Sequence, residues 1–304
     1  MRILSDAEAG GEYQSGPHEE QEPARSRINL GGIRSVIAFA SAKGGVGKST
    51  LLVNVAAALA LKGRKVGIAD LDVNAPSITA MLGLRRPRVF SIGDQIDPAN
   101  GPLGLRVIAS NVMAESHPPP PSFTDDEPAP ITSNGAAPVQ LSGPQMIRRL
   151  LAQTRFGTLD FLLIDLAPGL GELRQIAELV ALGGIVLVSH PSELGVSAAR
   201  AALKAAAETS TPVIGIVENM AGFYCGNCHS VRPLLPQGEM SALVRESGVT
   251  VLSRLSFDPR LAESCDSGML FVHDYADAPL AKQIGELAGR LDEHAGAPQH
   301  KAQV

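Results

Sequence analysis

The sequence has too few cysteines and too short apolar runs for several specialised classes of protein. Three cysteines in 304 residues do not make a disulfide framework. The chain has no uninterrupted run of 18 apolar residues, so we expect no transmembrane helix. After Met1 the sequence soon becomes acidic and polar, which leaves no apolar core for a signal peptide. These absences favour a reduced cytoplasmic protein with no stable membrane association.

An excess of positive charge is also missing. The formal net charge is -5 and the isoelectric point is near 5.8, so the composition lacks the excess of basic residues that is typical of nucleic-acid-binding proteins. A length of 304 residues suffices for a sizeable core, and α/β domains often exceed 200 residues. We therefore expect one folded domain that does not bind nucleic acid.

A glycine-rich segment between an expected strand and an expected helix is the strongest signal in the chain. Residues 35–41 form an apolar run suited to a buried parallel strand, and residues 49–61 are rich in Ala and Leu, which favours a helix. Strand, glycine-rich loop and helix in this order are typical of a phosphate-binding loop. The expected nucleotide-binding residues are Ala42, Lys43, Gly44, Gly45, Val46, Gly47, Lys48, Ser49 and Thr50.

Each residue type in this loop has a physical role at a phosphate. The glycines let the backbone turn sharply and point several N–H groups into one concavity, to which the following helix adds its positive end. Lys48 can reach the β- and γ-phosphates, and the Ser49 hydroxyl can ligate Mg²⁺. The general pattern has glycine where this chain has Ala42, and Lys43 adds a second lysine at the head of the loop.

Carboxylates follow two further expected strands. Residues 64–70 end in Asp70, with Asp72 two positions later, and residues 159–165 end in Asp165 before a Gly/Pro turn. Carboxyl ends of parallel strands face the crevice in which ligands bind in open α/β sheets. Asp165 therefore suits a Mg²⁺-bound water, and the turn after it suits a sensor of the γ-phosphate. Asp70 is interpreted as structural.

The remaining chain alternates between helix and strand signals, which predicts an α/β fold with a doubly wound, mostly parallel sheet and helices on both faces. We expect a disordered acidic tail over residues 1–30, a domain over 31–294, and a polar tail over 295–304. A Pro-rich disordered insertion is expected at about 115–141. The expected later elements are strands at 105–110, 184–189, 212–219 and 249–255, and helices at 78–84, 145–153, 173–182, 196–208, 239–247 and 279–291.

Cys225 and Cys228 form a C-x-x-C pair in the second informative segment. Two thiolates suit one soft metal centre but do not complete a tetrahedral site. A redox dithiol, a zinc site completed by a second subunit or by His229, and a [4Fe–4S] cluster shared by two subunits remain open, as do ordinary buried cysteines. Cys265 has no partner at motif spacing and is interpreted as a packed thiol.

Taken together, the motifs resemble one family. Lys43-Gly-Gly-Val-Gly-Lys-Ser belongs to the signature-lysine type, which includes the MinD/ParA class. The further motifs Asp70-x-Asp72, Asp165-Leu-x-Pro-Gly-x-Gly, Glu218-Asn-Met and Cys225-x-x-Cys228 occur in the order and approximate spacing of the Mrp/ApbC (NBP35-like) iron–sulfur carrier ATPases. The similarity covers about residues 33 to 292 and implies a P-loop NTPase of the SIMIBI type.

The resemblance also implies roles. It assigns adenine recognition to Asn219, a place near Mg²⁺ and the attacking water to Asp72, and Lys43 to the nucleotide of a partner subunit. It implies a homodimer that binds ATP, with Mg²⁺ held by Ser49, Asp72 and Asp165. It also implies that Cys225 and Cys228 hold a [4Fe–4S] cluster that bridges the two subunits and is passed to apo iron–sulfur proteins.

The sequence also predicts weak ATP hydrolysis and leaves two alternative functions open. Ala167, Leu170 and Glu172 differ from the usual second switch of the family, so we expect weak ATP hydrolysis. A MinD/ParA-type positioning ATPase without a metal cluster is the main alternative, although the basic amphipathic end or basic patches that it would need are missing. A zinc-bridged dimer that binds client proteins is a second alternative.

Overall fold

The structure is a computed structural model that describes residues 27–85, 90–92, 95–112, 142–225, 227–228 and 230–296. Most of the expected acidic tail, the whole of the expected Pro-rich insertion and most of the polar tail lie outside the described residues. The body nevertheless begins before residue 31, because the Ile28 N–H donates to the Leu179 carbonyl at 2.7 Å. Leu30 also packs against the core.

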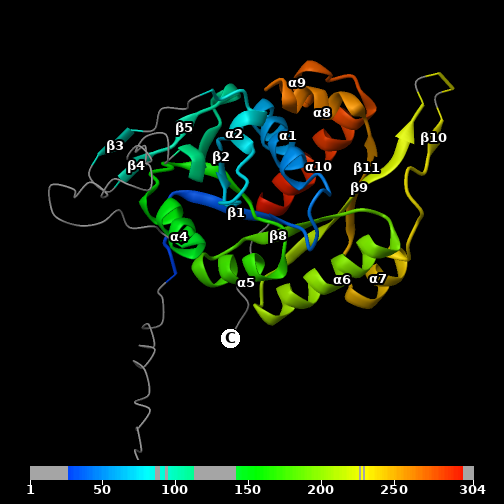
Figure 1. The fold of residues 1–304 in the computed structure, drawn as a ribbon, viewed down its shortest axis with the longest axis horizontal. Helices are drawn as coiled ribbons and strands as arrows, with labels where there is room; N and C mark the ends of the chain where they lie inside the picture. Colours follow the sequence, from blue (N-terminus) through cyan, green and yellow to red (C-terminus); the bar gives the residue numbers. More distant parts are fainter. Residues whose placement is uncertain are drawn as a thin grey trace, which may run out of the picture.

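A mostly parallel sheet forms the centre of the molecule (Figure 1). Its strands follow the order β10-β9-β8-β1-β7-β2-β6-β5, and β11 pairs with β9. β5 and β10 are antiparallel to their neighbours, and a separate hairpin joins β3 to β4. The strands are β1 (Ile33–Ala40), β2 (Val66–Asp70), β3 (Phe90–Ile92), β4 (Gln95–Asp97), β5 (Ala99–Asn100), β6 (Arg106–Ala109), β7 (Leu159–Asp165), β8 (Gly184–Ser189), β9 (Val213–Tyr224), β10 (Val231–Arg232) and β11 (Val251–Phe257).

Helices cover both faces of this sheet (Figure 1). Side chains alternate along β1, so Ile37 and Phe39 enter one core while Val36 and Ala38 enter the other. The first core includes residues of α1, α9 and α10, and the second includes residues of α4 to α7. The helices are α1 (Lys48–Leu61), α2 (Ile78–Met81), the 3-10 turn η1 (Pro102–Gly104), α4 (Gly143–Gln153), α5 (Leu170–Leu179), α6 (Glu193–Glu208), α7 (Met240–Ser247), α8 (Pro259–Asp266), α9 (Phe271–Asp274) and α10 (Pro279–Gly296).

This architecture confirms the doubly wound α/β expectation and corrects several boundaries. The strand expected at 212–219 continues to Tyr224, and the helix expected at 173–182 lies at 170–179. The region between residues 86 and 104, for which no strand or helix was predicted, contains β3, β4 and β5, and α8 and α9 were not predicted either. β3, β4, β5 and α9 have two to four residues each, too few positions to show a hydrophobic period. α8 has eight residues, only two of which are buried, so it too shows little of an apolar pattern.

The register of the strands brings the motifs to one edge of the sheet. Asp165 at the end of β7 is level with Phe39 of β1 and with Asp70 of β2. Next to them, Ser189 at the end of β8 is level with Glu218 of β9. This carboxyl edge therefore collects the segments that sequence reasoning had singled out. Among the described residues, no helix combines the length and apolar character that crossing a bilayer requires.

Candidate functional site

The loop between β1 and α1 has the backbone geometry of an anion-binding turn. Gly45 and Gly47 have φ angles of 77° and 80°, in the left-handed region that favours glycine. Gly47 is the N-cap of α1, and its carbonyl accepts the Leu51 N–H at 2.9 Å. A side chain at Gly47 would also collide with Asn219, whose Nδ2 lies 2.4 Å from an ideal Cβ. Both the turn and the close neighbour therefore require glycine at this position.

Three polar side chains converge beside the start of α1. Lys48 is only 7% exposed, and its Nζ forms an ion pair with the fully buried Asp165 carboxylate. The Ser49 hydroxyl donates to Asp165 Oδ2 at 2.5 Å. Burial raises the pKa of Asp165, and the Lys48 ammonium opposes that rise. The structure thus brings together the two loop residues and the distant carboxylate that the sequence assigned to phosphate and Mg²⁺.

Asp70 and Asp72 have different surroundings on the β2–α2 loop. Asp70 is fully buried, and its carboxylate accepts the N–H groups of Asp72, Ser77 and Ile78 at 3.2, 2.9 and 3.1 Å. Burial, followed by the nearby Asp165 charge, raises the pKa of Asp70 to about 6. Asp72 is half-buried and accepts the Ala75 N–H at 3.1 Å. Asp70 therefore holds the loop in place, as expected, and Asp72 stands at the less enclosed position.

The turn after β7 packs against the phosphate loop. The Gly169 N–H donates to the Ser41 carbonyl at 3.0 Å, and Pro168 Cγ lies 3.8 Å from an ideal Cβ at Gly44. This contact places the expected second switch directly beside the loop whose ligand it would sense.

Asn219 lies under the phosphate loop. It is 7% exposed, its Nδ2 donates to the Val46 carbonyl at 2.9 Å, and its Oδ1 accepts the Met220 N–H at 3.0 Å. The adjacent Glu218 is buried and paired with Arg254 on β11. Asn219 therefore links β9 to the loop, while its contact with adenine stays a prediction.

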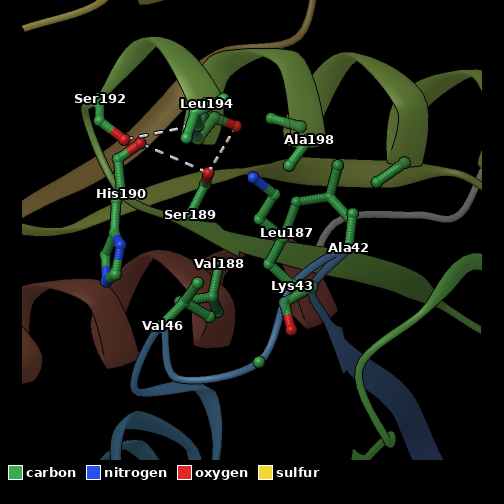
Figure 2. Close-up of a pocket in the computed structure, with 15 residues that line it drawn as sticks. Ala42, Lys43, Val46, Leu187, Val188, Ser189, His190, Ser192, Leu194 and Ala198 are labelled. Atoms are coloured by element: carbon green, nitrogen blue, oxygen red, sulfur yellow. Dashed lines mark hydrogen bonds between the residues drawn. The ribbon is translucent and has the colours of Figure 1, made fainter.

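Lys43 lies on the rim of a cavity of about 200 Å³ between the phosphate loop, β8 and α6. Its side chain is exposed and extends from the loop toward α6 (Figure 2). Two other polar atoms of the lining, Ser41 Oγ and His190 Nε2, are buried without a hydrogen bond among the described residues. Burial lowers the pKa of His190. Sequence reasoning missed this cavity, because the small residues of α6 that line it look like ordinary helix formers.

The cysteine pair lies where β9 turns toward β10, beyond the strand end that the sequence suggested. Cys225 is half-buried and Cys228 is exposed, and the Cys225 N–H donates to the Ser230 carbonyl at 3.0 Å. The Ser230 hydroxyl lies 2.9 Å from Cys228 Sγ, and this hydrogen bond lowers the pKa of the Cys228 thiol. A lowered pKa favours the thiolate, which is the form that binds metals.

This geometry decides between some of the sequence alternatives. The pair is not buried, which argues against ordinary core cysteines. It lies in a turn between two strands, whereas the dithiol of a thioredoxin-like protein would lie at the start of a helix. Among the residues with a described position, no three His, Cys, Asp or Glu side chains form a group able to hold a metal ion. His229 lies outside the described residues. Sequence reasoning missed Ser230, although a hydroxyl two residues after Cys228 was available as a signal.

Cys265 is a packed thiol, as expected: it is 5% exposed, and burial raises its pKa to about 11.

Comparisons with known proteins agree with the motifs. The family model described as "ParA: NUBPL iron-transfer P-loop NTPase" matches residues 32–292. An iron–sulfur cluster carrier protein of Methanococcus maripaludis is 37% identical over 256 residues, covering 83% of each chain.

Solved structures show the same relationship. A nucleotide-binding protein of Archaeoglobus fulgidus, solved in complex with ADP, is 32% identical with a TM-score of 0.67, covering 84% of this chain and 93% of that one. The cell division ATPase MinD of Pyrococcus furiosus shares the fold at 18% identity and a TM-score of 0.59, covering 85% of this chain and 98% of its own. The match to the family model and the identity to the curated relative together establish that this chain belongs to the NUBPL-type, ParA-related family of iron-transfer P-loop NTPases.

Proposed function

We propose that this protein is an ATP-dependent iron–sulfur cluster carrier that receives a cluster on Cys225 and Cys228 and transfers it to apo iron–sulfur proteins. The observation that carries the proposal is the pair formed by exposed Cys228 and half-buried Cys225, which belongs to no group of three or more metal-binding side chains among the described residues. The same chain has a glycine-rich loop with the geometry of an anion-binding turn. Two such chains supply the four thiolates that a [4Fe–4S] cluster takes. The names of the iron–sulfur carrier relatives support the same cargo.

ATP fits the phosphate loop with Mg²⁺ beside it. The N–H groups around Gly45 and Gly47 suit the phosphates, and Lys48 suits the β/γ-phosphate charge. The Ser49 hydroxyl and the Asp165 carboxylate already lie 2.5 Å apart, so their oxygens suit one hard cation, with Asp72 nearby. Bound Mg²⁺ would neutralise charge on the phosphates. Phosphate binding also requires Lys48 to exchange its contact with Asp165 for a contact with the nucleotide.

Hydrolysis serves as a slow dimer switch in this proposal. Lys43 is exposed at the head of the loop, where it can reach the nucleotide of a second subunit and stabilise phosphate charge. Replacing Lys43 with Ala should leave ATP affinity unchanged and slow turnover by about 100-fold. Equal turnover in the two proteins would remove the trans role of Lys43.

The positioning-ATPase alternative is disfavoured by α10, the last helix within the described residues. A MinD-like membrane helix would present a free apolar face. In α10 the apolar face is buried in the core, with Ile284 and Leu291 fully enclosed. We accordingly propose a cytoplasmic protein whose partners are a second copy and recipient apoproteins, without nucleic acid.

Metal and sulfide analysis tests the proposal directly. Protein purified without oxygen, or reconstituted with iron and sulfide, should be brown and hold about four iron and four sulfide per two chains. It should then activate an apo iron–sulfur protein in a transfer assay. A colourless protein with stoichiometric zinc would reject the cluster and support the zinc-bridged dimer.

A further inference from the structure

The cavity beside Lys43 has a mostly apolar lining. It lies between the phosphate loop, the end of β8 and the first part of α6, with Ala42 and Lys43 on the loop side and Leu194 and Ala198 on the helix side (Figure 2). Leu194 is 69% exposed, the largest exposed fraction among the large apolar side chains that the structure describes. The cavity therefore offers apolar surface that a small ligand could cover.

Four polar side chains besides Lys43 line the cavity, and two of them lack hydrogen-bond partners. Ser189 Oγ donates to the Gly195 carbonyl at 2.8 Å, and the Gly195 N–H donates to Ser192 Oγ at 3.3 Å. In the described part of the chain, Ser41 Oγ and His190 Nε2 are buried without a partner, and Ser41 is only 4% exposed. Burying a polar atom is unfavourable unless it is hydrogen-bonded, so these two atoms favour an occupant with a polar group.

The charge of the lining indicates the sign of that group. Lys43 is its only Lys, Arg, Asp or Glu, and burial lowers the pKa of His190, which favours the neutral imidazole. Within the described ranges no carboxylate forms an ion pair with Lys43, whose side chain extends toward α6 (Figure 2). An anionic ligand would therefore meet one free ammonium group and no like charge.

This cavity is separate from the groups assigned to the nucleotide in the same chain. Lys48, Ser49, Asp165 and Asn219, which are assigned to phosphate, Mg²⁺ and adenine, do not line it. Lys43 is the only residue of the lining to which the proposed function gives a role in turnover. A ligand in the cavity would therefore act on turnover through Lys43 and leave the site for ATP free.

We propose that the cavity binds a short-chain carboxylate, with the carboxylate group on Lys43 and the apolar chain against Leu194 and Ala198. Since an apolar cavity of about 150 Å³ holds benzene, one of about 200 Å³ suits a ligand of roughly eight non-hydrogen atoms. The bound carboxylate would keep Lys43 within its own chain and so inhibit ATP turnover without changing ATP affinity. This consequence rests on the proposed function, whereas the binding itself concerns one chain.

Calorimetry on the nucleotide-free protein, with hexanoate as the probe, tests the cavity. Hexanoate should bind with a Kd of about 1 mM. Ala198→Leu fills the cavity from a half-buried position on α6 and should weaken this binding about tenfold. Ala207→Leu, the same substitution at an exposed position of the same helix, should leave the affinity unchanged. Equal affinities in the two variants, or no binding to the wild type at about 10 mM, would overturn the proposal.

The headgroup of the probe tests the role of Lys43. Lys43→Met keeps an unbranched side chain without the charge, so it should weaken hexanoate binding about tenfold and leave hexanol binding unchanged. Hexylammonium should not bind to the wild type, because its charge has the sign of the lysine. Equal weakening of hexanoate and hexanol would overturn the proposal.

ATP turnover gives a readout of the consequence. At saturating ATP, hexanoate at about ten times its Kd should lower turnover of the wild type and of Ala207→Leu about tenfold, with no effect on Ala198→Leu. ATP affinity should be equal with and without hexanoate. Turnover that is unaffected by bound hexanoate would overturn the proposal. Binding that is sensitive to Ala198→Leu, in protein that takes up no iron and sulfide, would keep this site and reject the carrier function.

Discussion

The phosphate loop is built in the opposite way to the paired ends of β9 and β10 with the two cysteines between them, which we call the sulfur arm. At the loop, Lys48 and Asp165 are almost completely enclosed and already paired within one chain. At the sulfur arm, Cys228 is exposed and Val231 is 65% exposed, and within the described ranges β10 pairs with β9 alone. A site of the first kind is built from side chains enclosed within one chain, whereas a site of the second kind is completed by another molecule. The comparison teaches that the two activities should respond independently to substitution.

The largest expected effect is at the arm. Replacing Cys225 or Cys228 with Ser should abolish the absorbance of a reconstituted cluster near 400 nm, because each removes two of the four thiolates from a dimer. ATP affinity, measured by calorimetry on the same samples, should match wild type. Loss of nucleotide binding in the Cys228→Ser variant would contradict the independence of the two sites.

The second prediction concerns a substitution in the phosphate loop that should affect ATP binding and not the cluster. Lys48→Ala should weaken ATP binding by about 100-fold, because it removes the charge contact that Lys48 would make to phosphate. Iron and sulfide content after reconstitution should be unchanged. An unaltered nucleotide affinity would reject the assignment of the phosphate loop.

A third prediction concerns how the stability of the protein depends on pH through Asp70, at the end of β2. The pKa of Asp70 is about 6 in the folded chain and 3.8 ordinarily, so the folded chain binds this proton more tightly. The resulting contribution to stability is present below about pH 4 and is lost as the pH rises through 6. It amounts to about 3 kcal/mol at most.

Urea unfolding of the nucleotide-free and Mg²⁺-free protein between pH 4 and pH 7 measures this contribution. The Asp70→Asn variant should lack that part of the pH dependence, so the wild-type and variant curves should diverge across the range. Parallel curves would show that the Asp70 carboxyl does not titrate with a raised pKa.

The smallest expected effect is again at the arm. Ser230→Ala removes the hydrogen bond that lowers the pKa of Cys228, so less thiolate should be present at pH 7. The rate of Cys228 alkylation, measured in a Cys225→Ser background, should fall by about threefold. Ser241→Ala, elsewhere on the surface, serves as the control. A rate equal to that of the control would remove the proposed role of Ser230.

Sequence reasoning anticipated the sharp turn of the loop, since Gly45 and Gly47 both have a positive φ. The structure also pairs Lys48 with Asp165, while the contact of these residues with a nucleotide stays a prediction. The order of strands and helices was also predictable, because buried parallel strands are continuous apolar runs.

Other features depend on contacts that a linear pattern does not contain. The continuation of β9 to Tyr224 depends on its pairing with β10 and β11, and the link between Asn219 and Val46 joins residues far apart in sequence. The cavity beside Lys43 likewise arises only when the loop, β8 and α6 meet.

Strand β9 connects the phosphate loop to the cysteine pair. Asn219, near the middle of β9, is hydrogen-bonded to the loop that would grip phosphate, and Cys225 follows immediately after the strand. Between them Met220 has a φ of 57°, a rarely adopted backbone conformation for a side chain of its size. The backbone that contacts the phosphate loop and the backbone that carries the sulfur atoms therefore belong to one continuous segment of the chain.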